Sequence, residues 1–450
     1  MFDIWGLLLA FLTSTGLCLL AIKRPALFMN KDHMMRDLSA RQAQHTRPTP
    51  RVGGAAVVCA LLVGGLFHAQ DLERDLVLSL LAGFFVFWVG LREDVHRDVS
   101  SKIRLLAAFV SAGLAIALTG HVVPGLGVVQ TDIFFNFFIV GFAVTMVWSA
   151  GTCNALNLID GLNGLSSGYV IFASLGLFAI AGQTGDQDIQ IATSLLIAAT
   201  LGFFILNWPL GRIFMGDAGA YAIGHVLAWL GILLMARHPE VSGFSILLIL
   251  FWPVGDTIFS MIRRRLTRKA TDQSDRLHFH HLVVRALPLL LNRRLGKARY
   301  NSIATVLIYP LMIAPIVVGV MHWNQPVKAL FYLLLFTLLF IMSYAFGMEY
   351  FASHNFRRTK AVGQMQGAGS EALETISNLS GVYIQDSMAV DLRIYRPQGT
   401  ATWRVHVSAD GAEDHHWTDQ FQTDLAAWQA FLHQAQEFGI HTVIGSLRDY

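Results

Sequence analysis

The sequence predicts an all-α polytopic membrane protein with about 11 transmembrane helices, followed by a small cytosolic α/β module at the C-terminus. Hydrophobic residues make up 54% of the 450-residue chain and charged residues only 14%. The mean hydropathy is +0.50. Apolar runs recur as far as Phe346, and the hydropathy falls after it. A soluble protein of this length would carry far more charge, so the composition excludes one.

The apolar runs are the candidate spans. In chain order they cover 2–22, 53–67, 76–91, 103–118, 134–148, 168–181, 189–206, 218–236, 244–262, 303–321 and 329–346. Several are shorter than the roughly 20 residues that a perpendicular span prefers, so one or two are candidates for re-entrant segments. The first run follows Asp3 rather than a basic segment, which indicates a retained span and not a cleaved signal peptide.

The basic residues are distributed unequally between the two sides of the predicted bundle. One alternate set of loops holds 23 of the 33 Lys and Arg residues, the opposite set holds three, and the tail after Phe346 holds the other seven. By the positive-inside rule the rich loops and the tail are cytoplasmic. The N-terminus is therefore expected on the periplasmic side.

The first two basic loops carry charged residues at helix ends. The first contains Arg47 and Arg51 just before a pair of glycines, an arrangement that suits a phosphate group; binding to anionic lipid is an equal alternative. The second contains the adjacent carboxylates Glu93 and Asp94. This pair can bind a divalent cation or take a proton, and a solvated interfacial charge cluster is the ordinary alternative.

The third loop on this side has no Lys or Arg and spaces its polar side chains three residues apart. On a helix this step turns Asn154, Asn157 and Asp160 toward one side, and Asn163 continues the series. A network of hydrogen bonds between helices would explain these residues. Oxygen donors beside glycines fit a Mg²⁺ and nucleotide site better.

The fourth and fifth loops supply the remaining candidates. Asp217 lies between two glycines at the start of a helix, where an N-cap aspartate and a residue that meets a metal-bound pyrophosphate are equally consistent with the pattern. The fifth loop is the most basic and contains Arg276, His278, His280 and His281. No cysteine and no carboxylate–histidine helix accompanies these histidines, so polyphosphate binding is preferred to transition-metal binding.

Together the five loops resemble the polyprenyl-phosphate N-acetylhexosamine-1-phosphate transferase family, glycosyltransferase family 4. The likeness spans residues 30–285 and keeps the order of all five motifs. It implies transfer of N-acetylhexosamine-1-phosphate from a UDP-sugar to undecaprenyl or another polyprenyl phosphate, with release of UMP and with Mg²⁺ as cofactor or Mn²⁺ in its place. It also implies the bacterial inner membrane. The H-x-H-H form at 278–281 looks like the branch that uses UDP-N-acetylglucosamine or a close relative.

The resemblance also implies roles for the matched residues. The Mg²⁺ positions are Asn157 and Asp217. The nucleotide positions are Asn154, Asp160 and Asn163, the last of them facing the uracil ring. The catalytic positions are Glu93 and Asp94, one of which would position or deprotonate the lipid phosphate. The phosphate and sugar positions are Arg276, His278, His280 and His281, to which the first loop adds Arg51.

The motifs depart from the family pattern at three places. Glu93 replaces the usual aspartate, the spacing from Asp94 to Asp98 is one residue longer than in many relatives, and Ala220 stands where serine is common. A non-catalytic paralogue that acts as an assembly scaffold is therefore one alternative, and a transporter of lipid-linked sugars is another. The polar residues gather at one face rather than near the midplane, which favours an enzyme over a transporter. A two-step route through phosphorylated Asp94 is an alternative to direct attack.

The domain boundaries follow the hydropathy. Residues 1–346 are expected to form the membrane transferase domain, 347–370 a linker and 371–450 the cytosolic module. Residues 381–396 and 402–408 alternate like strands, and apolar residues between 421 and 438 follow helical spacing. The module lies outside the resemblance. It is expected to bind a downstream glycosyltransferase or a regulator, or to be a folded extension without a ligand. No nucleic acid partner is expected, and an oligomer is an open alternative.

Overall fold

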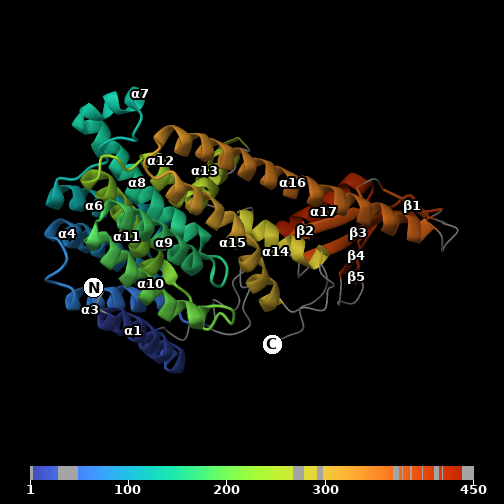
Figure 1. Ribbon diagram of the computed structural model, residues 1–450. Coiled ribbons are helices and arrows are strands. Elements are labelled where there is room, and N and C mark those ends of the chain that lie inside the picture. Colours follow the sequence, from blue (N-terminus) through green and yellow to red (C-terminus); the bar gives the residue numbers. More distant parts are fainter. Residues whose placement is uncertain are drawn as a thin grey trace. The chain divides into compact units, whose positions relative to one another are not determined.

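A computed structural model describes residues 4–28, 49–266, 278–290, 297–367, 374–377, 379–385, 388–397, 399–409, 415–417 and 419–437. The chain divides into two compact units, Met1–Phe346 and Gly347–Tyr450. Helices build the described part of the first unit, and the strands that the structure describes belong to the second (Figure 1).

The first unit is a bundle of helices that run through the apolar segments. Its elements are α1 (Ile4–Lys23), η1 (Pro25–Leu27), α3 (Gly53–Phe67), α4 (Arg74–Ala82), α5 (Phe84–His96), α6 (Ser101–Thr119), α7 (Val129–Asp132), η2 (Ile133–Asn136), α8 (Phe138–Ile159), α9 (Leu165–Thr184), α10 (Gln187–Asn207), α11 (Gly216–Arg237), α12 (Gly243–Ile249), α13 (Phe251–Leu266), α14 (Phe279–Leu290), α15 (Lys297–Met321) and the start of α16 (Pro326–Gly367).

The polytopic all-α membrane fold is confirmed. In the described part of the chain, nine helical segments are long and apolar enough to cross a membrane, and α4 and α5 count together as one of them. A tenth candidate is the pair α12 and α13, which is bent by 84°. The helix α3 is apolar but has only 15 residues. The described residues of all 11 predicted runs thus lie on helical segments. The difference from the lower number of full spans comes from 53–67, whose helix α3 is short, and from 244–262, whose helices α12 and α13 are bent relative to each other.

Helix α11 is the core of the bundle. In its apolar window 94% of the residues are buried, and it packs against α3, α5 and α8. Small residues let these backbones approach closely. A methyl group added at Gly54 would lie 2.1 Å from the Cα of Gly219, and one added at Gly90 would lie 2.7 Å from the Cα of Ala218. The first turn of α11 is therefore pressed between α3 and α5.

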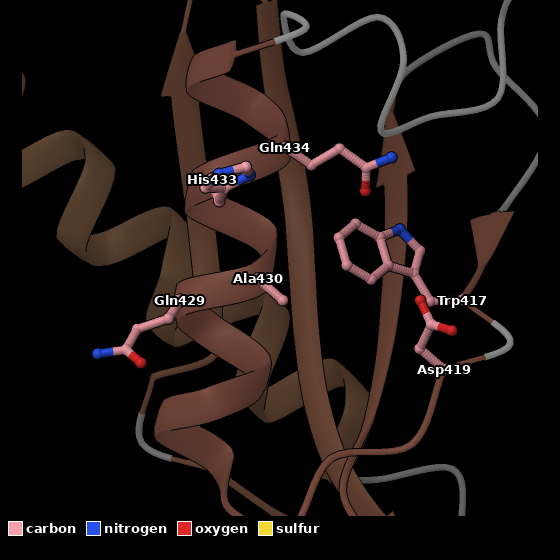
Figure 2. Close-up of a pocket in the computed structure, with 6 residues that line it drawn as sticks. All are labelled: Trp417, Asp419, Gln429, Ala430, His433 and Gln434. Atoms are coloured by element: carbon pink, nitrogen blue, oxygen red, sulfur yellow. The ribbon is translucent and has the colours of Figure 1, made fainter.

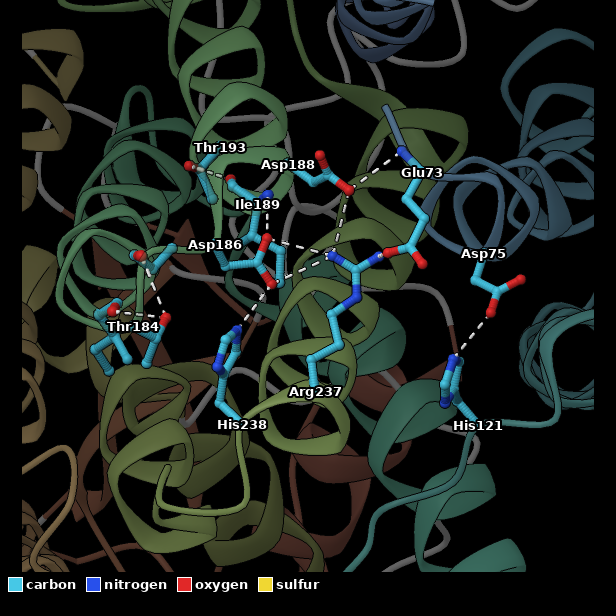
Figure 3. A network of polar contacts seen from close by, with 12 residues as sticks. Glu73, Asp75, His121, Thr184, Asp186, Asp188, Ile189, Thr193, Arg237 and His238 are labelled. Carbon is cyan, nitrogen blue, oxygen red and sulfur yellow. Dashed lines mark hydrogen bonds and ion pairs between the residues drawn. The ribbon is translucent and has the colours of Figure 1, made fainter. Parts of the chain in front are cut away.

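An ionic network holds the other end of α11 (Figure 3). Arg237, the last residue of the helix, lies 2.5 Å from a carboxylate oxygen of Glu73 and 3.2 Å from one of Asp186. Asp186 also accepts the N–H of Ile189 at 3.1 Å and so caps α10. Nearby, His121 lies 3.1 Å from a carboxylate oxygen of Asp75 (Figure 3). These contacts tie α4, α10 and α11 together at the end of the bundle remote from Asp217.

In the described part of the second unit that follows α16, an antiparallel sheet packs against a helix. Its strands are β1 (Glu374–Ile376), β2 (Gly381–Gln385), β3 (Met388–Pro397), β4 (Arg404–Ala409) and β5 (His415–His416), in the order β1-β3-β4-β5 with β2 also paired to β3. The helix is α17 (Asp424–Glu437). Alternate residues of β3 and β4 pack on residues of α17 that recur at helical spacing. The buried residues are Val390, Leu392, Ile394, Val405, Val407, Ala427, Phe431 and Ala435. The predicted α/β module is confirmed as a fold.

The segment predicted as a linker is mostly helical. Helix α16 continues to Gly367 and so covers 347–367 of this segment, whereas 368–370 lie outside the described residues. The hydropathy falls after Phe346, but no proline occurs before the end of the helix. A loss of hydropathy therefore marked the end of the apolar segment without marking the end of the helix.

A groove of about 480 Å³ lies on the second unit, along α17 (Figure 2). Its lining residues are Trp417, Asp419, Gln429, Ala430, His433 and Gln434. The indole of Trp417 lies beside Gln434, whereas Gln429 projects on the other side of the helix (Figure 2). The lining contains no Lys or Arg, so this groove lacks the groups that bind phosphate most readily.

Candidate active site

A polar cavity of about 120 Å³ lies in the first unit at the ends of three helices. Its lining residues are Arg51, Glu93, Asp94, Arg97 and Asp217. Arg51 precedes α3, the acidic pair belongs to the last turn of α5, and Asp217 belongs to the first turn of α11. The first, second and fourth loops of the sequence analysis therefore meet at one point.

Backbone hydrogen bonds join the first loop to the fourth. Gly53 donates its N–H to Phe214 O at 2.9 Å and Gly54 donates to Met215 O at 2.7 Å. Gly216 has a φ of +76°, and a methyl group there would lie 2.0 Å from the carbonyl oxygen of Arg51. Only glycine adopts this conformation in so little space. The glycines of the two loops thus hold Arg51 beside Asp217.

Asp94 caps helix α11. Its two carboxylate oxygens accept the N–H groups of Asp217 and Ala218, each at 2.8 Å, and the residue is only 7% exposed. A carboxylate is stabilised at this helix terminus by the unpaired N–H groups and by the helix dipole. The N-cap residue of α11 is Met215 and Asp217 lies inside the first turn, so the N-cap interpretation of Asp217 is wrong. The side chain of Asp217 is available for other contacts.

The side chain of Asp217 meets two other helices. Asn157, near the end of α8, donates from Nδ2 to Oδ1 of Asp217 at 2.7 Å, and Arg104 of α6 forms an ion pair with Oδ2. The two residues predicted as Mg²⁺ ligands are therefore adjacent. Arg104 received no role in the sequence analysis, which counted it only among the basic residues at the start of an apolar run. A basic residue within an apolar helix is the signal that could have found it.

Two residues of the third loop are bonded within the bundle. Oδ1 of Asn154 accepts a hydrogen bond from the hydroxyl of Tyr221 at 3.3 Å. Asp160 follows α8 and accepts a hydrogen bond from the hydroxyl of Ser166. Burial raises the pKa of Asp160 to about 7, although Ser166 and the charge of Arg51 act in the opposite direction. The Arg51 charge reaches Asp160, which relates the third loop to the cavity.

Asn163 lies away from the residues that line the cavity. It is 3% exposed, its N–H donates to Oδ1 of Asn301 at 2.8 Å, and its carbonyl accepts from the hydroxyl of Thr305 at 2.8 Å. Its side-chain amide reaches the carbonyl of Pro209 at 3.5 Å. These contacts attach the third loop to α15. The role of Asn163 at the uracil ring stays a prediction.

The turn after α5 presents a further cation. Arg97 has a φ of 56° and is the one non-glycine residue with positive φ among the described residues. Its side chain lines the cavity. Glu93 stabilises the turn, because Oε2 accepts the N–H of Val99 at 2.8 Å. Asp98, where the spacing departs from the family pattern, pairs with Arg92 at 2.7 Å on the surface. A strained residue at a polar cavity is a candidate for function.

The described part of the fifth loop is fixed on α13. Asp256 of α13 lies 2.8 Å from Nδ1 of His278. His280 is 2% exposed, and a methyl group added at Gly161 would lie 2.5 Å from its Nε2. Burial lowers the pKa of His280 well below its usual range, so the ring is neutral near pH 7. His281 lies beside it, with ring centroids 4.1 Å apart. Arg276 lies outside the described residues.

Carboxylates, an amide and guanidinium groups thus converge at helix ends of an apolar bundle, which defines a polytopic membrane protein with a polar, charged cavity at one end of the bundle. Residues 76–235 match glycosyl transferase family 4. The probable undecaprenyl-phosphate N-acetylglucosaminyl 1-phosphate transferase of Bacillus subtilis is 30% identical over 251 residues, which cover 54% of this chain and 68% of that protein.

Two further relatives bear on the assignment. The undecaprenyl-phosphate alpha-N-acetylglucosaminyl 1-phosphate transferase of Yersinia pestis is 34% identical over 260 residues, or 54% of this chain and 67% of that protein. The phospho-N-acetylmuramoyl-pentapeptide-transferase of Lactiplantibacillus plantarum is 28% identical over 265 residues, or 55% and 79% of the two chains. The chain belongs to glycosyl transferase family 4, the family that the five loops resemble.

Proposed function

We propose that this protein transfers N-acetylhexosamine-1-phosphate from a UDP-sugar to undecaprenyl phosphate or another polyprenyl phosphate and releases UMP. One observation carries the proposal, namely the cavity at the helix ends where Arg51, Arg97 and Asp217 meet. Guanidinium groups match the oxygens of phosphate, and the membrane position suits an acceptor whose tail stays in lipid. The names of the relatives support the same reaction class.

In the proposed reaction an oxygen of the polyprenyl phosphate attacks the β-phosphorus of the UDP-sugar. A bond forms between these two atoms, and the bond from the β-phosphorus to the oxygen bridging the two phosphates breaks. UMP leaves with that oxygen. Both reactants are anions, so the main task of the protein is to align them and to offset their charge. Arg51 and Arg97 are assigned to the phosphate oxygens.

Asp94 is proposed to orient the site. Both of its oxygens accept N–H groups of α11, and this contact sets the position of Asp217. The arrangement favours direct attack by the lipid phosphate over a phosphorylated Asp94, because a phosphoryl group on either oxygen would disrupt the cap. The other residue of the acidic pair, Glu93, is therefore proposed to position the lipid phosphate. Its Oε2 accepts the N–H of Val99.

The donor set around Asp217 fits Mg²⁺. The cation prefers oxygen ligands and is usually bound by one or two carboxylates together with substrate phosphates and water. Asp217 supplies the carboxylate, and rotation of the Asn157 amide would turn its oxygen to the point where Nδ2 now donates. The described residues contain no cluster of three or more His, Cys, Asp or Glu that could hold a metal alone. A bound Mg²⁺ would offset the charge of the diphosphate.

We also propose that the site faces the cytoplasm of a bacterial cell and that the N-terminus is periplasmic. The excess of Lys and Arg in the loops at this end of the bundle supports that orientation. The loops at the opposite end hold only Arg74, Arg237 and Lys328. The C-terminal unit would then also be cytoplasmic.

The test is a transfer assay in detergent. Purified protein receives undecaprenyl phosphate, Mg²⁺ and radiolabelled UDP-N-acetylglucosamine, and both UMP release and label in the lipid phase are measured. Asp217→Ala should abolish both products. Asp71→Ala is the matched control, because Asp71 follows the other end of α3 and its side chain is 62% exposed.

Equal amounts of UMP and lipid-linked label, lost with EDTA and restored by Mg²⁺ or Mn²⁺, would support the proposal. The rates with other UDP-hexosamines then show which donor sugar the protein prefers. If no UDP-hexosamine gives either product while the protein shows a cooperative unfolding transition, the catalytic proposal is wrong.

A further inference from the structure

The fifth loop re-enters the bundle at His278, where a buried carboxylate holds the imidazole. Asp256 is 1% exposed and His278 is 5% exposed. Oδ2 of Asp256 lies 2.8 Å from Nδ1 of His278, and Oδ1 accepts the N–H of Phe279 at 3.2 Å. Both oxygens of the carboxylate are therefore used, one on His278, which precedes α14, and one on Phe279, its first residue.

The contact has a chemical consequence for the ring. A buried carboxylate is costly unless it is paired, and His278 and Phe279 provide its partners. When Nδ1–H donates to a carboxylate, the tautomer and the orientation of the imidazole are set, and Nε2 becomes the nitrogen that meets a ligand. The negative charge of Asp256 also stabilises positive charge that develops on the ring.

The neighbours of His278 place it at the same end of the bundle as the third loop. Its ring is nearly parallel to that of His280, with 11° between the planes and 5.7 Å between the centroids. His280 in turn lies against Gly161, the residue after Asp160. Ser260 reaches Nδ1 of His278 at 3.3 Å from the same helix as Asp256. An orientation set by Asp256 is therefore transmitted to the group of histidines assigned to phosphate and sugar.

We propose that Asp256 is a positioning residue for the transfer reaction, which acts through His278 by holding its Nε2 toward the bound pyrophosphate and sugar. The inference rests on the proposed function, because it takes His278 to belong to the substrate-binding loop. It assigns a role to a residue that the loop motif does not include.

The first experiment compares two carboxylate–imidazole pairs. Asp256→Asn keeps the shape of the side chain and an acceptor oxygen but removes the charge. It should lower kcat about 10- to 100-fold, the range found when a residue that orients a metal-bound histidine is removed. Asp75→Asn removes the charge from the pair with His121 at the other end of the bundle, and it should leave kcat unchanged within about 2-fold.

The second experiment separates positioning from a structural role by a double-mutant cycle. If Asp256 acts through His278, then Asp256→Asn adds less than about 2-fold in a His278→Asn background, because the two changes remove one interaction. The same cycle is measured on the Kd of the UDP-sugar, which requires no turnover. A structural role through the N–H of Phe279 would persist in both backgrounds.

The outcomes are distinct. If wild-type protein forms no product from any UDP-sugar, the proposed function fails. If wild-type protein turns over and Asp256→Asn keeps its rate, or loses the same factor in both backgrounds, the positioning role is wrong. If Asp256→Asn alone loses its unfolding transition, the pair Asp256→Asn/His278→Asn is compared with His278→Asn. Equal activity then supports the inference, and a further tenfold loss overturns it.

Discussion

Replacement of Gly216 by alanine tests whether the contact between the first and fourth loops builds the cavity. The added methyl group would lie 2.0 Å from the carbonyl oxygen of Arg51 and 2.7 Å from Oδ2 of Asp94. The first of these atoms is backbone and cannot rotate away. The φ of +76° adds a cost of about 1–2 kcal/mol for a residue with a Cβ. The loops must therefore separate, and Arg51 must move away from Asp217.

The expected effect on activity is larger than the effect on stability. A displacement of about 1 Å at the reacting groups costs on the order of 100-fold in rate. A loss of about 1–2 kcal/mol lowers the unfolding midpoint by only about 1–3 °C in a chain of this size. Rates are measured as UMP release, and unfolding is followed by intrinsic fluorescence in the same detergent.

The matched control is Gly65→Ala. Gly65 lies on α3, in the same helix as the glycines of the first loop, and no atom lies within 4 Å of the added methyl group. Alanine is the better helix former, so this variant should keep its rate and gain up to about 1 kcal/mol of stability. If Gly216→Ala transfers sugar phosphate as fast as Gly65→Ala, the loop contact does not determine the geometry of the site and the reasoning is refuted.

Three further predictions concern the surroundings of the cavity. Arg104→Met removes the ion pair with Asp217 and should lower kcat about 10-fold or more. A hydrogen bond to a charged group contributes about 1.5–3 kcal/mol, and each 1.4 kcal/mol corresponds to a factor of about ten in rate. An unchanged kcat would contradict a role for this ion pair. Gly161→Ala should displace His280 and raise the KM for the UDP-sugar, whereas Gly151→Ala, with open space around it, should not. The unfolding midpoint should fall as the pH drops below about 6.5, and His280→Gln should flatten this dependence. The pKa of His280 is depressed in the folded state, so the unfolded chain binds the proton more readily and protonation favours unfolding. If the unfolding midpoint of the His280→Gln variant depends on pH as steeply as that of the wild type, other groups cause the effect.

Local sequence patterns predicted part of the candidate site. The spacing of Asn157 and the glycines around Asp217 marked the two residues that form a hydrogen bond across 60 positions of sequence. The same patterns left open whether Asp217 was a helix cap. The cap is Asp94, which comes from a different helix, and no property of the sequence near Asp217 specifies that partner.

The residues that the sequence analysis missed share one cause. Arg104 was counted only among the basic residues of the second loop and Asp256 only as a residue near a helix end at the fifth loop, and neither received a role at the site. Their partners, Asp217 and His278, lie on other elements. Ion pairs between helices depend on which helix faces pack against each other, and the hydropathy of a segment does not predict this packing.

By itself the sequence determined the membrane class, the order of the helices, the end of the bundle that carries the motifs and the α/β nature of the C-terminal unit. These properties depend on the transfer of each residue from water to lipid or to a core, which is a local quantity. The tertiary structure alone decided that Asp94 holds α11, that Arg104 pairs with Asp217 and that Asp256 holds His278. These contacts depend on the close approach of backbones at Gly54, Gly90 and Gly216, and the approach is fixed only when all the helices pack at once.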